Sequence, residues 1–155
     1  MSCYADTSFL LKLVLPESDS ERAMAEFRSL AFPPLFYTPL HALEVTNAIR
    51  QRAFHLRRNL PAKQRAAISR ERDAALARLN HWLKRGWLLD VSVDLEEAFR
   101  LSLAFSEQHT ERLGCRAFDL FHVALAVHLR ARTFLTADLI QAKLARSQAL
   151  EVHSP

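Results

Sequence analysis

The sequence predicts an α/β fold, with a central parallel β-sheet of about five strands flanked by helices. Short β-type runs alternate with longer helical patterns along the whole chain, which is typical of βαβ units. Half of the 155 residues are hydrophobic and a quarter are charged, as in ordinary globular domains. Because we find no linker, internal repeat or low-complexity segment, we expect residues 1–155 to form a single domain.

Each element follows from a local pattern. Short β-type runs predict strands at 2–5, 35–38, 87–91, 133–136 and 150–153. Helical spacing of apolar residues predicts helices at 8–15, 18–30, 40–58, 62–85, 94–112, 117–131 and 139–147. Thr38 followed by Pro39 is typical of an N-cap with proline at the first helical position, and Pro61 is expected to open its helix in the same way. Asp94 with Glu97 has the spacing of a capping box.

Positive charge is concentrated in one segment. The formal net charge is +4 for the whole chain but +9 for residues 50–85, which leaves −5 for the rest. The basic helical part, about residues 55–85, is also amphipathic. This asymmetry favours a polyanion or an acidic protein as partner, and a solvated helix face is the alternative. The candidate binding residues are Arg50, Arg52, Arg57, Arg58, Arg65 and Arg72.

The composition excludes several classes of protein. The longest apolar stretches are too short to span a bilayer, and the N-terminus lacks the positive segment of a secretory signal. Cys3 and Cys115 have no metal-type spacing, so we expect core thiols and a cytoplasmic protein. With two glycines in the chain, neither a dinucleotide-binding fingerprint nor a P-loop is present.

Four acidic residues lie in apolar surroundings, where a carboxylate needs a partner. Asp6 and Asp138 directly follow the first and fourth predicted strands. Glu44 lies about two turns into the helix after the second strand, and Asp119 lies near the start of the helix before the fourth. Because ligands of open α/β sheets bind at the carboxyl ends of the strands, we expect the four to converge there. Taken singly, Asp6 and Asp138 could instead be helix caps, and Asp119 could be a partner of the helix dipole. Glu44 is not in the first turn of its helix, so this alternative is weaker for it.

Four converging carboxylates require a cation. Two unit charges about 4 Å apart repel by roughly 4 kcal/mol at an effective dielectric of about 20, so an empty cluster would hold protons or move apart. Oxygen ligands suit Mg²⁺ or Mn²⁺, whereas zinc favours nitrogen and sulfur, and no two histidines have i, i+4 spacing. Because Mg²⁺ joins carboxylates to substrate phosphates, hydrolysis of a phosphodiester is the expected reaction.

Three segments together resemble a known family. ADTSFLLKL, LEVTNAI and AFDLFHVALAVHLRARTFLTAD are similar to segments of PIN domains, and within that superfamily to the VapC ribonuclease toxins, over roughly residues 3–145. The resemblance implies an endoribonuclease dependent on Mg²⁺ or Mn²⁺, acting as the toxin of a type II toxin–antitoxin pair. The residues that match the acidic core of the family, as catalytic and metal-binding groups, are Asp6, Glu44, Asp119 and Asp138.

The resemblance also implies supporting residues and partners. Ser8 and Thr136 match hydroxyl positions that support the acids, and Asn47 is expected to orient Glu44, with an ordinary cap or surface polar group as the alternative for each. The implied partners are the RNA substrate, a cognate antitoxin whose basic side chain reaches the acids, and a second copy of the chain. Apolar residues of the early helices offer a groove for such a partner, unless they fill the core: Phe9, Leu10, Leu13, Met24 and Phe27.

Two features fit the family less closely, and two other functions compete. The basic stretch from His55 to Arg85 is long, and no glycine precedes the final strand. A non-catalytic RNA-binding module on the same fold is the main alternative. A phosphotransfer domain would need a second acid two residues after Asp6, where Ser8 stands. We expect His122 to be a satisfied, packed histidine, with contact to substrate or to a water near the acids as the alternative. We expect Trp82 and Trp87 to belong to the core, with stacking on RNA bases as the alternative.

Overall fold

The structure, a computed structural model, describes residues 3–155. One all-parallel sheet has the strand order β3-β2-β1-β4-β5. Its strands are β1 (Cys3–Ala5), β2 (Leu35–Tyr37), β3 (Leu88–Asp90), β4 (Thr133–Leu135) and β5 (Glu151–His153). The predicted fold class is therefore confirmed, and every predicted strand boundary other than the start of the first strand lies within one residue of the observed one. The predicted start of the first strand at Ser2 falls outside the described residues.

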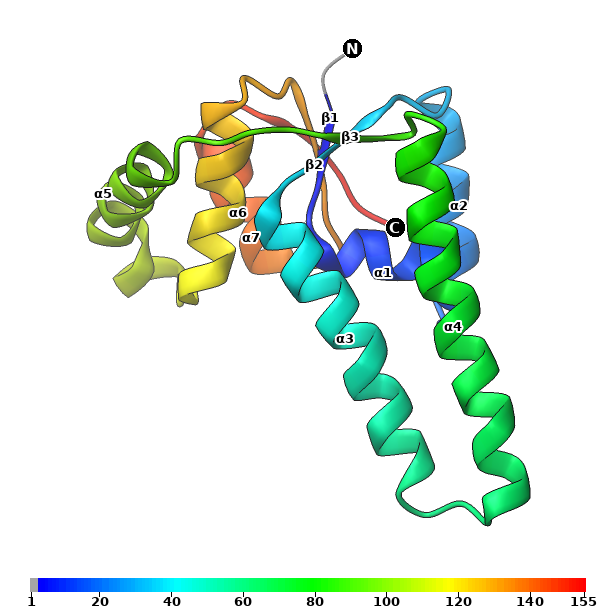
Figure 1. The fold of residues 1–155 in the computed structure, drawn as a ribbon. Helices are drawn as coiled ribbons and strands as arrows, with labels where there is room; N and C mark the ends of the chain where they lie inside the picture. Colours follow the sequence, from blue (N-terminus) through cyan, green and yellow to red (C-terminus); the bar gives the residue numbers. More distant parts are fainter. Residues whose placement is uncertain (1–2) are drawn as a thin grey trace.

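Seven helices within the described residues flank this sheet (Figure 1). They are α1 (Thr7–Val14), α2 (Ser20–Ser29), α3 (Pro39–Arg57), α4 (Ala62–Lys84), α5 (Leu95–Leu113), α6 (Ala117–His128) and α7 (Leu139–Ser147). All seven predicted helices are present. The helix predicted to reach residue 131 ends at His128, because the chain leaves the helical region and takes a left-handed conformation at Arg130, with φ 54°.

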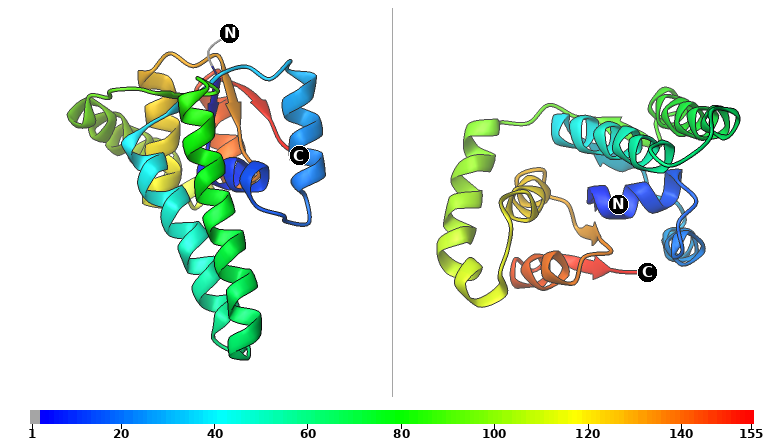
Figure 2. Two further views of the ribbon diagram at one scale, coloured as in Figure 1. Left: turned by 45° about the vertical axis from the view of Figure 1, so that its right-hand side comes forward. Right: turned by 90° about the horizontal axis from the view of Figure 1, so that it is seen from below.

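The sheet separates two hydrophobic cores. Successive side chains of a strand point to opposite faces, so Cys3 and Ala5 pack with α1 to α4, whereas Tyr4 packs mainly with α5, α6 and α7. Seen from below, the helices stand on both sides of the strands (Figure 2). Both cysteines are buried and free, as predicted, and burial raises the pKa of Cys3 to about 12.

The helix starts agree with the sequence signals in part. Thr38 is the N-cap of α3 and Pro39 its first residue, as predicted. Pro61 stands one position earlier than expected, as the N-cap of α4. Asp94 accepts a hydrogen bond from the Glu97 amide at 3.1 Å, but the Glu97 side chain pairs with an arginine one turn on. The expected capping box of α5 is therefore only half formed.

The final strand docks without a glycine before it. β5 pairs in parallel with β4, and Ala149 turns the chain with φ 60°. A left-handed conformation costs a non-glycine residue roughly 1–2 kcal/mol, so this turn carries strain that a glycine would avoid. The packing of Leu150 and Val152 in the core formed with α7 offsets that strain.

The apolar residues of the early helices take two different positions. Phe9, Leu10 and Leu13 are buried in the core and therefore offer no groove. An apolar pocket of about 320 Å³ is instead lined by Met24, Phe27, Phe32, Pro33, Trp82 and Trp87. Trp82 packs against the core, but the prediction of a core position is wrong for Trp87, which precedes the edge strand β3 and is 53% exposed.

The second half of α3 and the first half of α4 project from the body as an antiparallel pair (Figures 1 and 2), which we call the arm, residues 50–76. Ala53 and Ala75 are buried where the two helices meet the body and each other. Arg52 of α3 pairs with Glu71 of α4 at 3.4 Å. Across residues 3–155, no helix is both long enough and apolar enough to cross a membrane.

Candidate active site

The carboxyl ends of β1 and β4 fix the first two acids. Ala5 lies opposite Leu135, and the Asp6 amide donates a hydrogen bond to the Leu135 carbonyl at 2.9 Å. Helices α1 and α7 begin directly after these strands, with Asp6 and Asp138 as their N-caps. Both acids therefore lie at the same edge of the sheet, as their positions after predicted strands indicated.

Asp6 is fully buried and is held by hydroxyl groups. Ser8 donates to both carboxylate oxygens at 2.8 and 2.9 Å, and Thr136 donates to Oδ2 at 2.7 Å. The Phe9 amide adds a bond of 2.8 Å. Burial raises the pKa of Asp6 above its ordinary value, because the donors offset only part of the lost hydration. Thr136 also accepts from the Asp138 amide at 2.9 Å and so links the two acids.

Glu44 reaches the same region from α3. Its Oε2 accepts from Thr7 at 2.7 Å and lies 2.6 Å from Nε2 of His122. Burial raises the pKa of Glu44, but the hydrogen bonds and the charge of His122 outweigh that effect, so the pKa lies below its ordinary value. The expected contact with Asn47 is replaced: Asn47 is exposed, and the hydrogen bonds to Glu44 among the described residues come from α1 and α6.

Asp119, in the first turn of α6, is paired with a positively charged side chain, that of Arg116. The Arg116 guanidinium donates to both Asp119 oxygens at 2.9 and 3.0 Å, and the Arg116 amide adds a bond of 2.9 Å. Gln141 of α7 donates to Oδ1 at 3.1 Å. Burial raises the pKa of Asp119, yet these bonds together hold it below its ordinary value. Arg116 also reaches Asp138 at 3.4 Å.

The four predicted acids line one pocket of about 400 Å³ at the carboxyl end of the sheet, which we call the acid pocket. Its lining is Asp6, Thr7, Ser8, Leu11, Glu44, Arg116, Ala117, Phe118, Asp119, His122, Asp138 and Gln141. Four elements far apart in the sequence supply the acids. The expected convergence is therefore present in the structure.

The donor chemistry of this pocket fits a hard cation. Carboxylate oxygens dominate it, and the side-chain oxygen of Gln141 is buried without a hydrogen-bond partner among the described residues. In residues 3–155, no three Asp, Glu, His or Cys side chains lie close enough to hold one ion. The Arg116 guanidinium pairs with both Asp119 and Asp138. A metal ion held by these two acids would therefore compete with Arg116 for their oxygens.

Two buried histidines form hydrogen bonds between the neighbourhood of the acid pocket and the strand β1. His41 accepts from the Thr38 amide at 3.1 Å through Nδ1, so Nε2 donates to the Ala5 carbonyl at 2.7 Å. Burial holds the pKa of His41 well below its usual range, so the ring is neutral. His122 is packed and satisfied, as expected, with Tyr4 Oη 2.8 Å from Nδ1. Its second nitrogen nevertheless faces Glu44, a role that the sequence did not indicate.

Three polar residues of the pocket that bond to the acids escaped prediction. Arg116 precedes Asp119 by three residues, and the i, i+3 spacing at a helix start was the available signal. Thr7 and Gln141 touch acids that are distant in sequence, so no local signal marks them.

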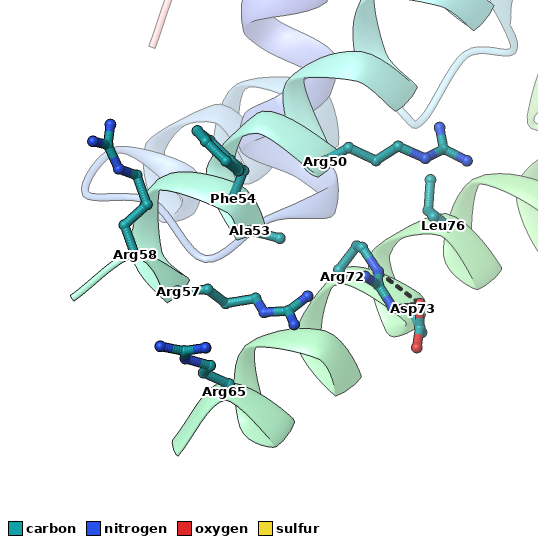
Figure 3. Close-up of a pocket in the computed structure, with 9 residues that line it drawn as sticks. All are labelled: Arg50, Ala53, Phe54, Arg57, Arg58, Arg65, Arg72, Asp73 and Leu76. Atoms are coloured by element: carbon teal, nitrogen blue, oxygen red, sulfur yellow. Dashed lines mark hydrogen bonds and ion pairs between the residues drawn. The ribbon is translucent and has the colours of Figure 1, made fainter. Parts of the chain in front are cut away.

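The candidate arginines lie elsewhere, on the arm. Five of the six line a second pocket between α3 and α4 (Figure 3), which we call the arginine pocket: Arg50, Arg57, Arg58, Arg65 and Arg72. Arg52 does not line it, because its side chain turns toward Glu71.

Taken together, the fold and the acid pocket define a class: an all-parallel α/β domain with carboxylates gathered at the carboxyl ends of its strands. The family model described as PIN domain matches residues 3–147. The chain therefore belongs to the PIN domain family, whose members are generally metal-dependent nucleases. No curated protein matches the chain.

Proposed function

We propose that this chain is an endoribonuclease dependent on Mg²⁺ or Mn²⁺, and the toxin of a type II toxin–antitoxin pair. One observation carries the proposal: in a PIN domain, four carboxylates from four separate elements line a single pocket at the carboxyl end of the sheet. The resemblance of the sequence motifs to VapC toxins supports the choice of RNA as substrate.

The residues have distinct parts in this proposal. Asp6 and Asp119 are the principal ligands of the ion, with Glu44 and Asp138 completing the set. Ser8 and Thr136 hold the Asp6 carboxylate in one orientation through their hydroxyl groups. His122 and Thr7 favour the ionised form of Glu44. Arg116 neutralises Asp119 until an ion takes its place.

A bound ion of this kind lowers the pKa of a coordinated water and neutralises charge on the leaving oxygen of a phosphodiester. The chain contributes the enclosure and the fixed carboxylates. Glu44 and Asp138, with 21% and 26% of their side chains exposed, form the outer part of the pocket lining, whereas Asp6 lines its buried inner part. Substrate would therefore approach from the side of Glu44 and Asp138.

The test is cleavage of cellular RNA by the purified chain in Mg²⁺, Mn²⁺, Ca²⁺ or EDTA, compared with Asp119→Asn. We expect cleavage by the wild type with Mg²⁺ or Mn²⁺ only, and none by the variant. Asp90→Asn is the matched control, since Asp90 is exposed, ends β3 and does not line the acid pocket. Absence of cleavage in every metal, or equal cleavage by Asp119→Asn, would remove the proposal.

A non-catalytic RNA-binding module is the second candidate, favoured by the arginine pocket. It predicts RNA binding that falls with salt and is the same with and without metal, because counterion release needs no divalent ion. Cleavage that depends on Asp119 would exclude it.

Partners belong to the same proposal. An antitoxin would bring a basic side chain to the acids, in competition with Arg116. A second copy of the chain has an apolar surface available, because Phe99 and Leu103, one turn apart on α5, are 58% and 67% exposed. We expect a cytoplasmic homodimer that co-purifies with the product of a neighbouring small reading frame. Light scattering of the chain with and without Phe99→Ser tests the dimer.

A further inference from the structure

The arginine pocket has a volume of about 770 Å³. Figure 3 shows its lining residues on the two helices of the arm. Arg50, Arg57 and Arg58 enter it from α3, and Arg65 and Arg72 enter it from α4. No residue is shared between the linings of the two pockets. Its function must therefore be explained independently of the acids.

Most of this positive charge is not neutralised by the chain. Asp73 is the one acid of the lining, and it pairs with Arg72 at 2.8 Å. Among the described residues, no carboxylate pairs with the other four arginines: Arg50 and Arg65 donate to backbone carbonyls, and Arg58 lies over an aromatic ring. These four arginines, which line one pocket without a paired carboxylate in the described part of the chain, give it a positive potential. The pocket therefore favours a negatively charged ligand.

An exposed aromatic ring accompanies the arginines. Phe54 lines the pocket, is 59% exposed and carries the Arg58 guanidinium 5.7 Å from its ring centre. Aromatic rings stack on unpaired bases while arginines contact phosphates, and this pairing is typical of sites for single-stranded nucleic acid. An acidic peptide would use the arginines, but its carboxylate side chains have no aromatic face to stack on the ring. Phe54 therefore favours nucleic acid over an acidic protein.

One helix connects the two pockets. Glu44 stands in the first half of α3, and Arg58 is fourteen residues further along the chain, at the C-cap of the same helix. At 1.5 Å and 100° per residue, Arg58 lies about 21 Å along the axis from Glu44 and within about 40° around it. A strand bound at Arg58 can thus run along α3 toward the acid pocket.

We propose that the arginine pocket is a binding site for single-stranded RNA, which holds a segment of the substrate about 20 Å from the acid pocket. This inference rests on the proposed function for the identity of the nucleic acid. Arg57, Arg58 and Arg65 contact phosphates, and Phe54 stacks on a base. The arm thus supplies affinity, and the acid pocket supplies the chemistry.

The experiment measures binding of a short fluorescein-labelled single-stranded RNA by anisotropy, in EDTA, so that no cleavage intervenes. The test variant is Arg57→Gln/Arg58→Gln/Arg65→Gln. The matched control is Lys63→Gln/Arg70→Gln/Lys84→Gln, which removes the same charge from exposed positions of α4 outside the pocket. We expect the test variant to bind at least about tenfold more weakly than the control, and its salt slope to be smaller by about 2, at roughly 0.7 per phosphate contact.

Three further measurements identify the ligand and guard against misfolding of the variant. Phe54→Leu should weaken binding about tenfold without changing the salt slope, because it removes a stacked base and no phosphate contact. Ultraviolet crosslinking of the RNA to the wild-type chain should label the peptide that contains Phe54. Polyglutamate is the competitor for an acidic protein ligand and should not displace the RNA at equal charge.

The outcomes separate this inference from the proposed function. An equal loss of RNA affinity in the test and control variants would contradict RNA binding at the arginine pocket. Crosslinks found only in peptides without Phe54 would contradict it too. Displacement by polyglutamate with no effect of Phe54→Leu would assign the pocket to an acidic protein instead. If the chain cleaves RNA while binding is indifferent to the arm, only this inference fails. If binding depends on the arm but no RNA is cleaved, only the proposed nuclease fails.

Discussion

The acid pocket and the arginine pocket are built in opposite ways. The acids come from four elements spread over the chain, and Asp6 and Asp119 are buried and saturated with hydrogen bonds. The arginines come from two consecutive helices, and most of them are exposed and without a carboxylate partner among the described residues. Carboxylates held in fixed positions suit a reaction at one phosphodiester bond, whereas exposed arginines without carboxylate partners suit the binding of a flexible, negatively charged chain. If both proposals hold, RNA cleavage and RNA binding should be separable by mutation.

The largest effect should come from removing an acid. Asp119→Asn is expected to lower RNA cleavage by more than about 100-fold, beyond the 10- to 100-fold typical of residues that only support a metal ligand. RNA binding in EDTA should stay within about twofold of the wild type, because the phosphate contacts lie on the arm. Single-turnover cleavage and anisotropy measure the two quantities. A parallel loss of binding would show that the pockets are not independent.

The next largest difference between the two pockets should appear in the free energy of unfolding of their variants. His122 is 2% exposed and bonds to both Tyr4 and Glu44, so His122→Leu leaves buried polar groups without that partner and should cost about 1–3 kcal/mol. Arg58→Gln on the arm should change the free energy of unfolding by less than about 0.5 kcal/mol. Urea denaturation of both variants checks this. Similar costs would contradict the view that only the acid pocket is tied to the core.

The pH dependence of stability should distinguish the two buried acids. The pKa of Asp6 is raised in the folded protein. Its contribution to folding stability is therefore present below its pKa in the unfolded chain, about 3.9, and is lost as the pH rises through its pKa in the folded protein. The pKa of Asp119 is lowered in the folded protein, so its contribution to folding stability is present above about 3.9 and is lost as the pH falls through its pKa in the folded protein.

Relative to the wild type in EDTA, Asp6→Asn should therefore gain stability as pH rises, whereas Asp119→Asn should lose it. Urea titrations at several pH values measure both slopes. Slopes of the same sign would contradict the assignment of Arg116 as the counter-ion of Asp119. The arm serves as the reference for pH dependence, because its arginines do not titrate in this range. The affinity for RNA should therefore not change with pH near neutrality.

The smallest effect should come from the single acid of the arginine pocket. Asp73→Asn frees Arg72 from its ion pair and should tighten RNA binding by about twofold, since exposed pairs are weak. Anisotropy in EDTA measures it, with Glu21→Gln on the exposed surface of α2 as the matched control. Weaker binding by Asp73→Asn would mean that Asp73 itself serves the ligand.

The sequence predicted what depends on local pattern and chain order. Strand and helix positions followed from periodicity, and acids placed directly after strands had to meet at one edge of a parallel sheet. Contacts between side chains of different helices were not predictable, because they depend on how each helix is rotated about its own axis. Glu44 thus meets Thr7 and His122 and not Asn47 on its own helix, and Arg116 folds back over Asp119. The exposure of Trp87 depended on strand order, which places β3 at the edge.

Arg116 has a consequence for the supply of metal in the cell. In many small metal-binding domains the ion completes the fold, so the protein is unfolded until the ion arrives. Here the guanidinium already balances Asp119 and reaches Asp138, and hydroxyl groups already satisfy Asp6. The fold is therefore expected not to depend on a bound ion. If the chain is the proposed nuclease, a shortage of divalent ions in the cell would limit the rate of RNA cleavage and leave the amount of folded protein unchanged.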